Sequence, residues 1–151
     1  MTDATAPQPP GGITPHLVCR DAAAAIDFYT RAFGADEMVR LPGKDGRLVH
    51  AALRINGGMV MLVDEFPDMG GTSPATLGGS PVSLHMMVPD ATAAIETAVA
   101  AGATLTMAAQ PMFWGDLYGV VTDPFGHVWS LATPLGPPKS SEELAAALAA
   151  A

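Results

Sequence analysis

Two stretches of the chain match each other: Ile13-Thr-Pro-His-Leu-Val-Cys-Arg-Asp-Ala-Ala-Ala-Ala-Ile26 and Val82-Ser-Leu-His-Met-Met-Val-Pro-Asp-Ala-Thr-Ala-Ala-Ile95. The histidine, the aspartate and the final isoleucine of the first stretch align with those of the second in one register. Chance can align a few alanines, but it seldom aligns these three residue types together. The chain is therefore predicted to contain two copies of one structural unit.

Each copy is predicted to be a strand followed by a helix. Residues 13–20 alternate in polarity, and Asp21 is a good helix N-cap because its carboxylate accepts free backbone N–H groups. Residues 22–33 are then rich in helix formers, with apolar side chains on one face. In the second copy, the same pattern predicts a helix over 90–101.

Three shorter strands are predicted after each helix, separated by turn sequences such as Asp123-Pro-Phe-Gly126. The resulting fold class is α+β, with the order βαβββ occurring twice. One helix in each unit covers one face of a sheet. The predicted strands are 36–41, 47–55 and 59–64 in the first unit and 104–108, 117–122 and 127–132 in the second.

The chain reads as one compact domain with accessory segments. A final short helix is expected at 140–149, because Ser140 and Glu143 have the spacing of a capping box. The segments are a disordered lead (1–12), a first unit (13–65), a linker rich in glycine and proline (66–80), a second unit (81–133) and a tail (134–151).

Composition limits the classes of partner. The net charge of −8 disfavours nucleic acid, and no apolar run is long enough to predict a membrane helix. The single cysteine, Cys19, excludes a disulfide within the chain and favours a cytoplasmic location. We interpret it as a small buried side chain and not as a nucleophile.

Several motifs resemble those of one superfamily. They are Asp21…Phe28-Tyr29…Phe33-Gly34, Pro42-Gly-Lys-Asp-Gly46 with His50, Phe113-Trp-Gly-Asp-Leu-Tyr-Gly119, and Asp123-Pro-Phe-Gly-His-Val-Trp-Ser130. Residues 13–133 resemble the vicinal-oxygen-chelate proteins, which include glyoxalase I, bleomycin-resistance proteins and extradiol dioxygenases, and are most similar to the PhnB-like branch. The resemblance implies a cupped, mostly antiparallel sheet around a ligand cavity, and a homodimer.

The resemblance also implies where a metal would bind. At the family's metal-ligand positions this chain has only hydroxyl and thioether side chains. These are weak or soft ligands for a divalent ion, so no cofactor is expected there. A divalent metal such as zinc remains open, because three imidazoles would form a competent ligand set. By this resemblance, the ligand positions of the family are occupied by Thr14, Met61, Ser83 and Ser130.

Strand alternation predicts which side chains face the cavity. One face mixes histidine, arginine, methionine and hydroxyl groups, as a ligand pocket does. The other face is apolar and is predicted to form the core, including Cys19, Val49, Val82 and Trp129. The predicted cavity face contains Thr14, His16, Arg20, His50, Arg54, Met61, Ser83, His85, Met87 and Ser130.

Two readings stay open for the polar residues of this face. His16, His85 and His50 are candidate catalytic or metal-binding residues that converge across a pseudo-two-fold axis, or they are hydrogen-bonded cavity histidines without chemistry. Arg20 and Arg54 hold an anionic ligand group, or they pair with acids such as Asp64 and Glu65 at the rim.

The aromatic loop after the second helix has two readings as well. Phe113, Trp114, Asp116 and Tyr118 form a wall that stacks on a flat or cationic ligand, or Trp114 plugs the end of the sheet. The predicted function is therefore binding of a small organic ligand without the usual metal site. The alternatives are a metal-dependent glyoxalase-like lyase, isomerase or dioxygenase, and a metal-free enzyme with a histidine base.

Overall fold

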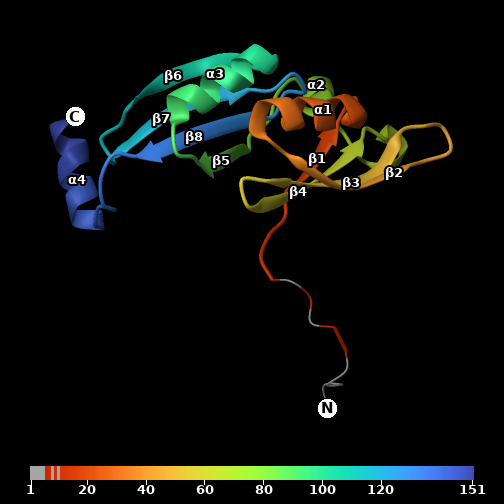
Figure 1. Ribbon diagram of the computed structural model, residues 1–151, viewed down its shortest axis with the longest axis horizontal. Helices are drawn as coiled ribbons and strands as arrows, with labels where there is room; N and C mark the ends of the chain where they lie inside the picture. Colours follow the sequence, from red (N-terminus) through yellow and green to blue (C-terminus); the bar gives the residue numbers. More distant parts are fainter. Residues whose placement is uncertain (1–5, 8, 10) are drawn as a thin grey trace.

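The computed structural model describes residues 6, 7, 9 and 11–151, so the predicted disordered lead over 1–12 lies largely outside the described residues. The chain forms two βαβββ units, which confirms the predicted α+β architecture (Figure 1). The first unit contains β1 (His16–Cys19), α1 (Ala22–Phe33), β2 (Asp36–Pro42), β3 (Leu48–Ile55) and β4 (Gly58–Asp64). The second contains β5 (Ser83–Met87), α3 (Ala91–Ala101), β6 (Thr104–Pro111), β7 (Asp116–Thr122) and β8 (Val128–Pro134).

The remaining elements lie outside the two units. The linker is not a plain loop, because it contains a 3₁₀ turn, η1 (Pro67–Met69), and a short helix, α2 (Pro74–Leu77). The C-terminal helix, α4 (Ser141–Ala150), begins at the predicted capping box of Ser140 and Glu143. Figure 1 shows α4 beyond the end of the second sheet, away from the helices that cover the core.

The two sheets are separate and repeat one strand order, β1-β4-β3-β2 and β5-β8-β7-β6. Each contains one parallel pair and two antiparallel pairs, so the predicted mostly antiparallel pairing is confirmed, although the sheets are not one hydrogen-bonded sheet. The registers correspond: His16 pairs with Met61 in the first unit, and His85 pairs with Ser130 in the second.

Matching caps begin the two long helices. The carboxylates of Asp21 and Asp90 each accept the backbone N–H three residues ahead, at 3.0 Å. At the other end of α1, Gly34 adopts φ 65°, a left-handed conformation that costs glycine little, and its N–H bonds to carbonyls of the last turn. These local signals explain why the sequence predicts the bounds of α1 correctly.

The core lies between the helices and one face of each sheet. Figure 1 shows α1 and α3 on the same side of the two sheets, and the helices contact each other. Trp129 of β8 is buried beneath them and packs against the rings of Tyr29 and Phe33 at centroid distances of 5.3 and 4.8 Å. The predictions that Trp129 and Cys19 belong to the core are confirmed.

Two core predictions are wrong. Val49 is 44% exposed, because an irregularity in the β2–β3 pairing turns Leu48 into the core in its place. Such a bulge shifts the alternation of side chains by one residue. Val82 is 61% exposed, because β5 begins only at Ser83.

The Asp123 carboxylate joins the two units in the core. One oxygen accepts hydrogen bonds from the Tyr29 hydroxyl of α1 and, at 2.9 Å, from the Trp129 indole. The other accepts the backbone N–H groups of Phe125 and His127, each at 2.9 Å, and so shapes the turn before β8. Burial and the neighbouring carboxylate raise the pKa of Tyr29 above its ordinary value, so Tyr29 remains a neutral donor.

We expect Asp123→Asn to lower the free energy of unfolding by about 3 kcal/mol, since four donors surround the carboxylate and an amide has only one accepting oxygen. Asp21→Asn is the matched control, because asparagine caps a helix as well as aspartate does. Urea denaturation of both variants measures the difference. Equal stability of the two variants would show that the Asp123 network does not hold the units together.

Candidate functional site

The candidate site lies on the open face of the second sheet, which we define as the side facing away from α1 and α3. His85 of β5 anchors it. Its Nδ1 is 2.7 Å from the hydroxyl of Ser130 on the neighbouring strand, and its Nε2 is 3.3 Å from the sulfur of Met87. The Ser130 side chain is buried, whereas His85 and Met87 are exposed. Strand pairing therefore brings three predicted site residues into contact.

An aromatic cluster, defined as His85, Tyr118, Trp114 and Phe113, extends from this anchor. The Tyr118 ring stacks on His85 at 6.0 Å and 22°. Trp114 stands edge-on to Tyr118 at 5.2 Å, and Phe113 edge-on to Trp114 at 5.1 Å. Stacked and edge-on rings give this face both flat and edge surfaces for a ligand. The predicted aromatic loop thus joins one of the predicted histidines.

The loop that contains Trp114 is held at three points. Its ends are closed by a backbone bond from Met112 N–H to the Asp116 carbonyl at 2.8 Å. The Trp114 indole donates to the Asp116 carboxylate at 3.1 Å, so this acid orients the ring. The tail after β8 adds a bond from Leu135 N–H to the Gly115 carbonyl at 2.9 Å. The rings are therefore positioned by backbone pairing on both sides.

In the first unit, the corresponding positions are not joined in this way. His16 is exposed on β1 with Met61 as its register partner, and His50 and Arg54 lie on the same face of β3. Among the described residues, the hydrogen bonds and ion pairs include none from the side chains of His16, His50 or Arg54. This face offers apolar and basic groups without a hydrogen-bonded anchor.

The predicted convergence of the histidines has no contact to support it within one chain. His16 borders a hollow beside the linker, whereas His85 borders a different one near the β3–β4 turn. Two residues, Pro15 and Leu84, line both hollows. The catalytic role of these histidines therefore stays a prediction. Thr14 lies before the start of β1, Ser83 is the first residue of β5, and both are exposed.

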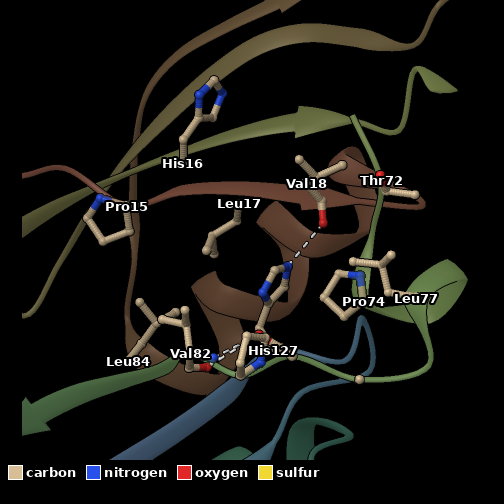
Figure 2. A pocket seen from close by; sticks show the side chains of 13 residues that line it. Pro15, His16, Leu17, Val18, Thr72, Pro74, Leu77, Val82, Leu84 and His127 are labelled. Carbon is tan, nitrogen blue, oxygen red and sulfur yellow. Dashed lines mark hydrogen bonds between the residues drawn. The ribbon is translucent and has the colours of Figure 1, made fainter. Parts of the chain in front are cut away.

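The hollow beside the linker has a volume of about 330 Å³ and is lined by His127, the first residue of the predicted strand 127–132 (Figure 2). His127 is buried there, and its Nε2 donates to the Val18 carbonyl of β1 at 3.1 Å. In Figure 2 the His16 ring lies on the other side of β1 from Leu17 and His127. The only sequence signal for His127 was its place directly after the turn at Gly126.

Arg20 follows the rim interpretation. Its guanidinium donates to the Thr76 hydroxyl at 2.9 Å and lies 3.8 Å from the Glu65 carboxylate. A hydrogen bond from the Ser73 backbone N–H is the main reason that the pKa of Glu65 lies below its usual range. A hydrogen bond with the Thr76 side chain lowers this pKa further. Asp64 has another role, because it accepts the N–H groups of Ala22 and Leu48 at 2.8 and 2.6 Å. Arg20 thus fastens the linker and does not face the open sheet.

The residues at the metal-ligand positions of the resembled family do not fit a divalent ion. They offer three hydroxyls and a thioether, and the hydroxyl of Ser130 is engaged with His85. Among the described residues, no group of three histidine, cysteine or acidic side chains comes close enough to share an ion. Cys19 is fully buried, and burial followed by nearby carboxylates raises the pKa of its thiol, so it is a poor ligand and nucleophile.

Sequence comparison assigns the family. The Glyoxalase/Bleomycin resistance protein/Dioxygenase superfamily profile matches residues 13–131, most of the chain. The chain belongs to this superfamily. The match covers the first unit and the second unit as far as residue 131 in β8, and so includes Ser130. Among the described residues, no helix has the length and hydropathy to span a bilayer.

The chain is similar to proteins known from sequence and from solved structures. An uncharacterized protein of Mycobacterium bovis is 56% identical over 126 residues, covering 82% of this chain and 83% of its own. A gene product of Arabidopsis thaliana is 30% identical with a TM-score of 0.67, covering 81% of this chain and 98% of its own. A Bacillus cereus PhnB protein, described as a putative 3-demethylubiquinone-9 3-methyltransferase, is 20% identical with a TM-score of 0.61, covering 82% and 99%. At that identity it supports the fold alone.

Proposed function

We propose that this superfamily member binds a small planar organic ligand on the open face of its second sheet, without a resident metal. The observation that carries the proposal is the contact chain from Ser130 through His85 and Tyr118 to Trp114. A ligand site needs a few oriented polar groups among apolar walls, and this face supplies both.

The charge of the protein supports a neutral or cationic ligand over an anionic one. The chain has a net charge of −8, and the carboxylate beside the cluster, Asp116, is bonded to Trp114 through one oxygen. A planar cation would gain from the aromatic faces and from the acidic surroundings. Of the two arginines predicted to hold an anion, Arg20 is engaged with the linker and Arg54 lies on the first sheet, away from the aromatic cluster.

A planar cation, 9-aminoacridine, is the first test compound. We expect it to bind the full chain, and Trp114→Ala to weaken binding by about tenfold, about 1.4 kcal/mol, because a stacking surface is lost. Isothermal titration calorimetry measures both affinities. Phe66→Ala is the matched control, because Phe66 stacks on Arg47 in the linker region, away from the cluster.

The proposal fails if the wild-type chain does not bind the compound, or if Trp114→Ala binds it as tightly as the wild type. Weakening by Phe66→Ala of the same size would assign the effect to general loss of structure.

We further propose that two copies associate to complete the site. Apolar side chains that are more than 40% exposed on the open faces include Val39, Leu41, Met59 and Met87. A ligand lying on the aromatic cluster of one copy would remain uncovered on its outer side. An apolar face of this kind on another copy would cover both the ligand and these side chains.

We expect the wild type to sediment with twice the 15.4 kDa mass of the chain, and Leu41→Glu to sediment as a monomer, because the charge would enter the interface. Leu148→Glu is the control, since Leu148 is as exposed as Leu41 but lies on α4. Analytical ultracentrifugation measures the masses. A monomeric wild type at micromolar concentration would contradict the paired arrangement.

The alternative of an enzyme with a histidine base remains in view because His85 is exposed on the same face. A histidine base must accept a proton, so this alternative requires the outward nitrogen of His85 to be unprotonated. Binding of a ligand has no such requirement.

A further inference from the structure

We infer that the neutral ring of His85 is held in the tautomer with its proton on Nε2, and that this N–H recognises a hydrogen-bond acceptor, such as a carbonyl, at the edge of the planar ligand. The inference rests on the proposed function for the ligand, but the state of the ring stands on the geometry around His85 alone. The expected ligands are therefore planar compounds that carry a hydrogen-bond acceptor at one edge, a narrower class than planar compounds in general.

The first step is the contact of His85 with Met87. The thioether sulfur of Met87 has no hydrogen, so it can only accept. Its 3.3 Å separation from Nε2 is favourable only if that nitrogen is protonated. With an unprotonated Nε2, the lone pairs of nitrogen and sulfur would face each other.

The second step is the contact of His85 with Ser130. A neutral ring with its proton on Nε2 has a lone pair on Nδ1, which then accepts the Ser130 hydroxyl at 2.7 Å. Ser130 is 3% exposed, and among the described residues its hydroxyl forms no other hydrogen bond. The opposite tautomer would leave that buried hydroxyl proton without a partner, which costs free energy. Both contacts therefore favour the same tautomer.

The third step concerns what the outward N–H can do. Sulfur is a weak acceptor, so a ligand oxygen can replace the Met87 sulfur as the partner of the His85 N–H at little cost in free energy. The Met87 side chain is 44% exposed, flexible and unbranched, so it can rotate away from the ligand. Tyr118 lies beside the imidazole and Trp114 lies beside Tyr118, so both would contact the ring system of the same ligand. Ser130 and Met87 are thus positioning residues, and His85 is the group that touches the ligand.

The state of the ring is read in the ligand-free protein by NMR of the full chain labelled with ¹⁵N-histidine. The His85 signals are those absent from the spectrum of His85→Gln. In the spectrum of the neutral ring, we expect the single ring proton on Nε2. Ser130→Ala is expected to mix the two tautomers, whereas Ser83→Ala, on the same face but opposite Val128, leaves the spectrum unchanged. A wild-type proton on Nδ1 would overturn the inference.

Ligand selectivity is read with a matched pair of planar compounds, 9-fluorenone and fluorene, which lacks the carbonyl acceptor. We expect the wild type to bind fluorenone about tenfold more tightly, as one hydrogen bond to a neutral donor provides. His85→Gln keeps a donor and is expected to keep part of the preference, whereas His85→Leu loses it. Equal binding of the pair by the wild type overturns the recognition role.

The two proposals fail in different ways. If neither compound binds while the proton is on Nε2, the ligand site is wrong and the assigned state of His85 stands. If both compounds bind but His85→Leu keeps the full preference for fluorenone, the site stands and His85 is not its donor.

Discussion

The position of one unit against the other depends on the buried carboxylate of Asp123. Its oxygens accept the hydroxyl of Tyr29 from the first unit and the indole of Trp129 from the second, and they also fix the turn that begins β8. A buried carboxylate is costly unless it is fully hydrogen-bonded, and here four donors satisfy it. The same turn delivers His127 to the carbonyl of Val18. Because Ser130 lies on β8, the placement of the candidate site follows from this network.

Duplication supplied equivalent positions that have diverged in chemistry. His16 faces Met61 in the first unit, and His85 faces Ser130 in the second. His50 and Tyr118 also correspond, since each precedes the residue paired with Leu62 or Leu131. Among the described residues, only the second unit combines a hydroxyl, an imidazole and a phenol in contact. We interpret the second unit as the recognition surface and the first as an apolar and basic cover.

Much of the fold follows from local signals in the sequence. The repeat, the capping aspartates and the glycine after α1 predict both units and the bounds of α1, and alternation places Trp129 and Cys19 in the core. The exposure of Val49 could not be predicted, because a bulge depends on pairing between β2 and β3. The inward position of His127 depends on contacts with β1, which is distant in sequence.

The site was predicted in part for the same reason. Alternation places His85, Met87 and Ser130 on one face, and a loop rich in aromatic residues suggests a wall, so their contacts are the natural result of strand pairing. Alternation gives the face of a residue but not its distance from residues of another sheet. Pseudo-symmetry therefore suggested that His16 and His85 converge, yet the chain places them at separate hollows.

The most direct test of the account is where a ligand binds. Backbone amide shifts in a titration with 9-aminoacridine map the location over the whole chain. The account predicts the largest shifts in β5, β7 and residues 112–118. Largest shifts around the linker and His127, with the aromatic cluster unchanged, would contradict it and move the binding site to the hollow of Figure 2.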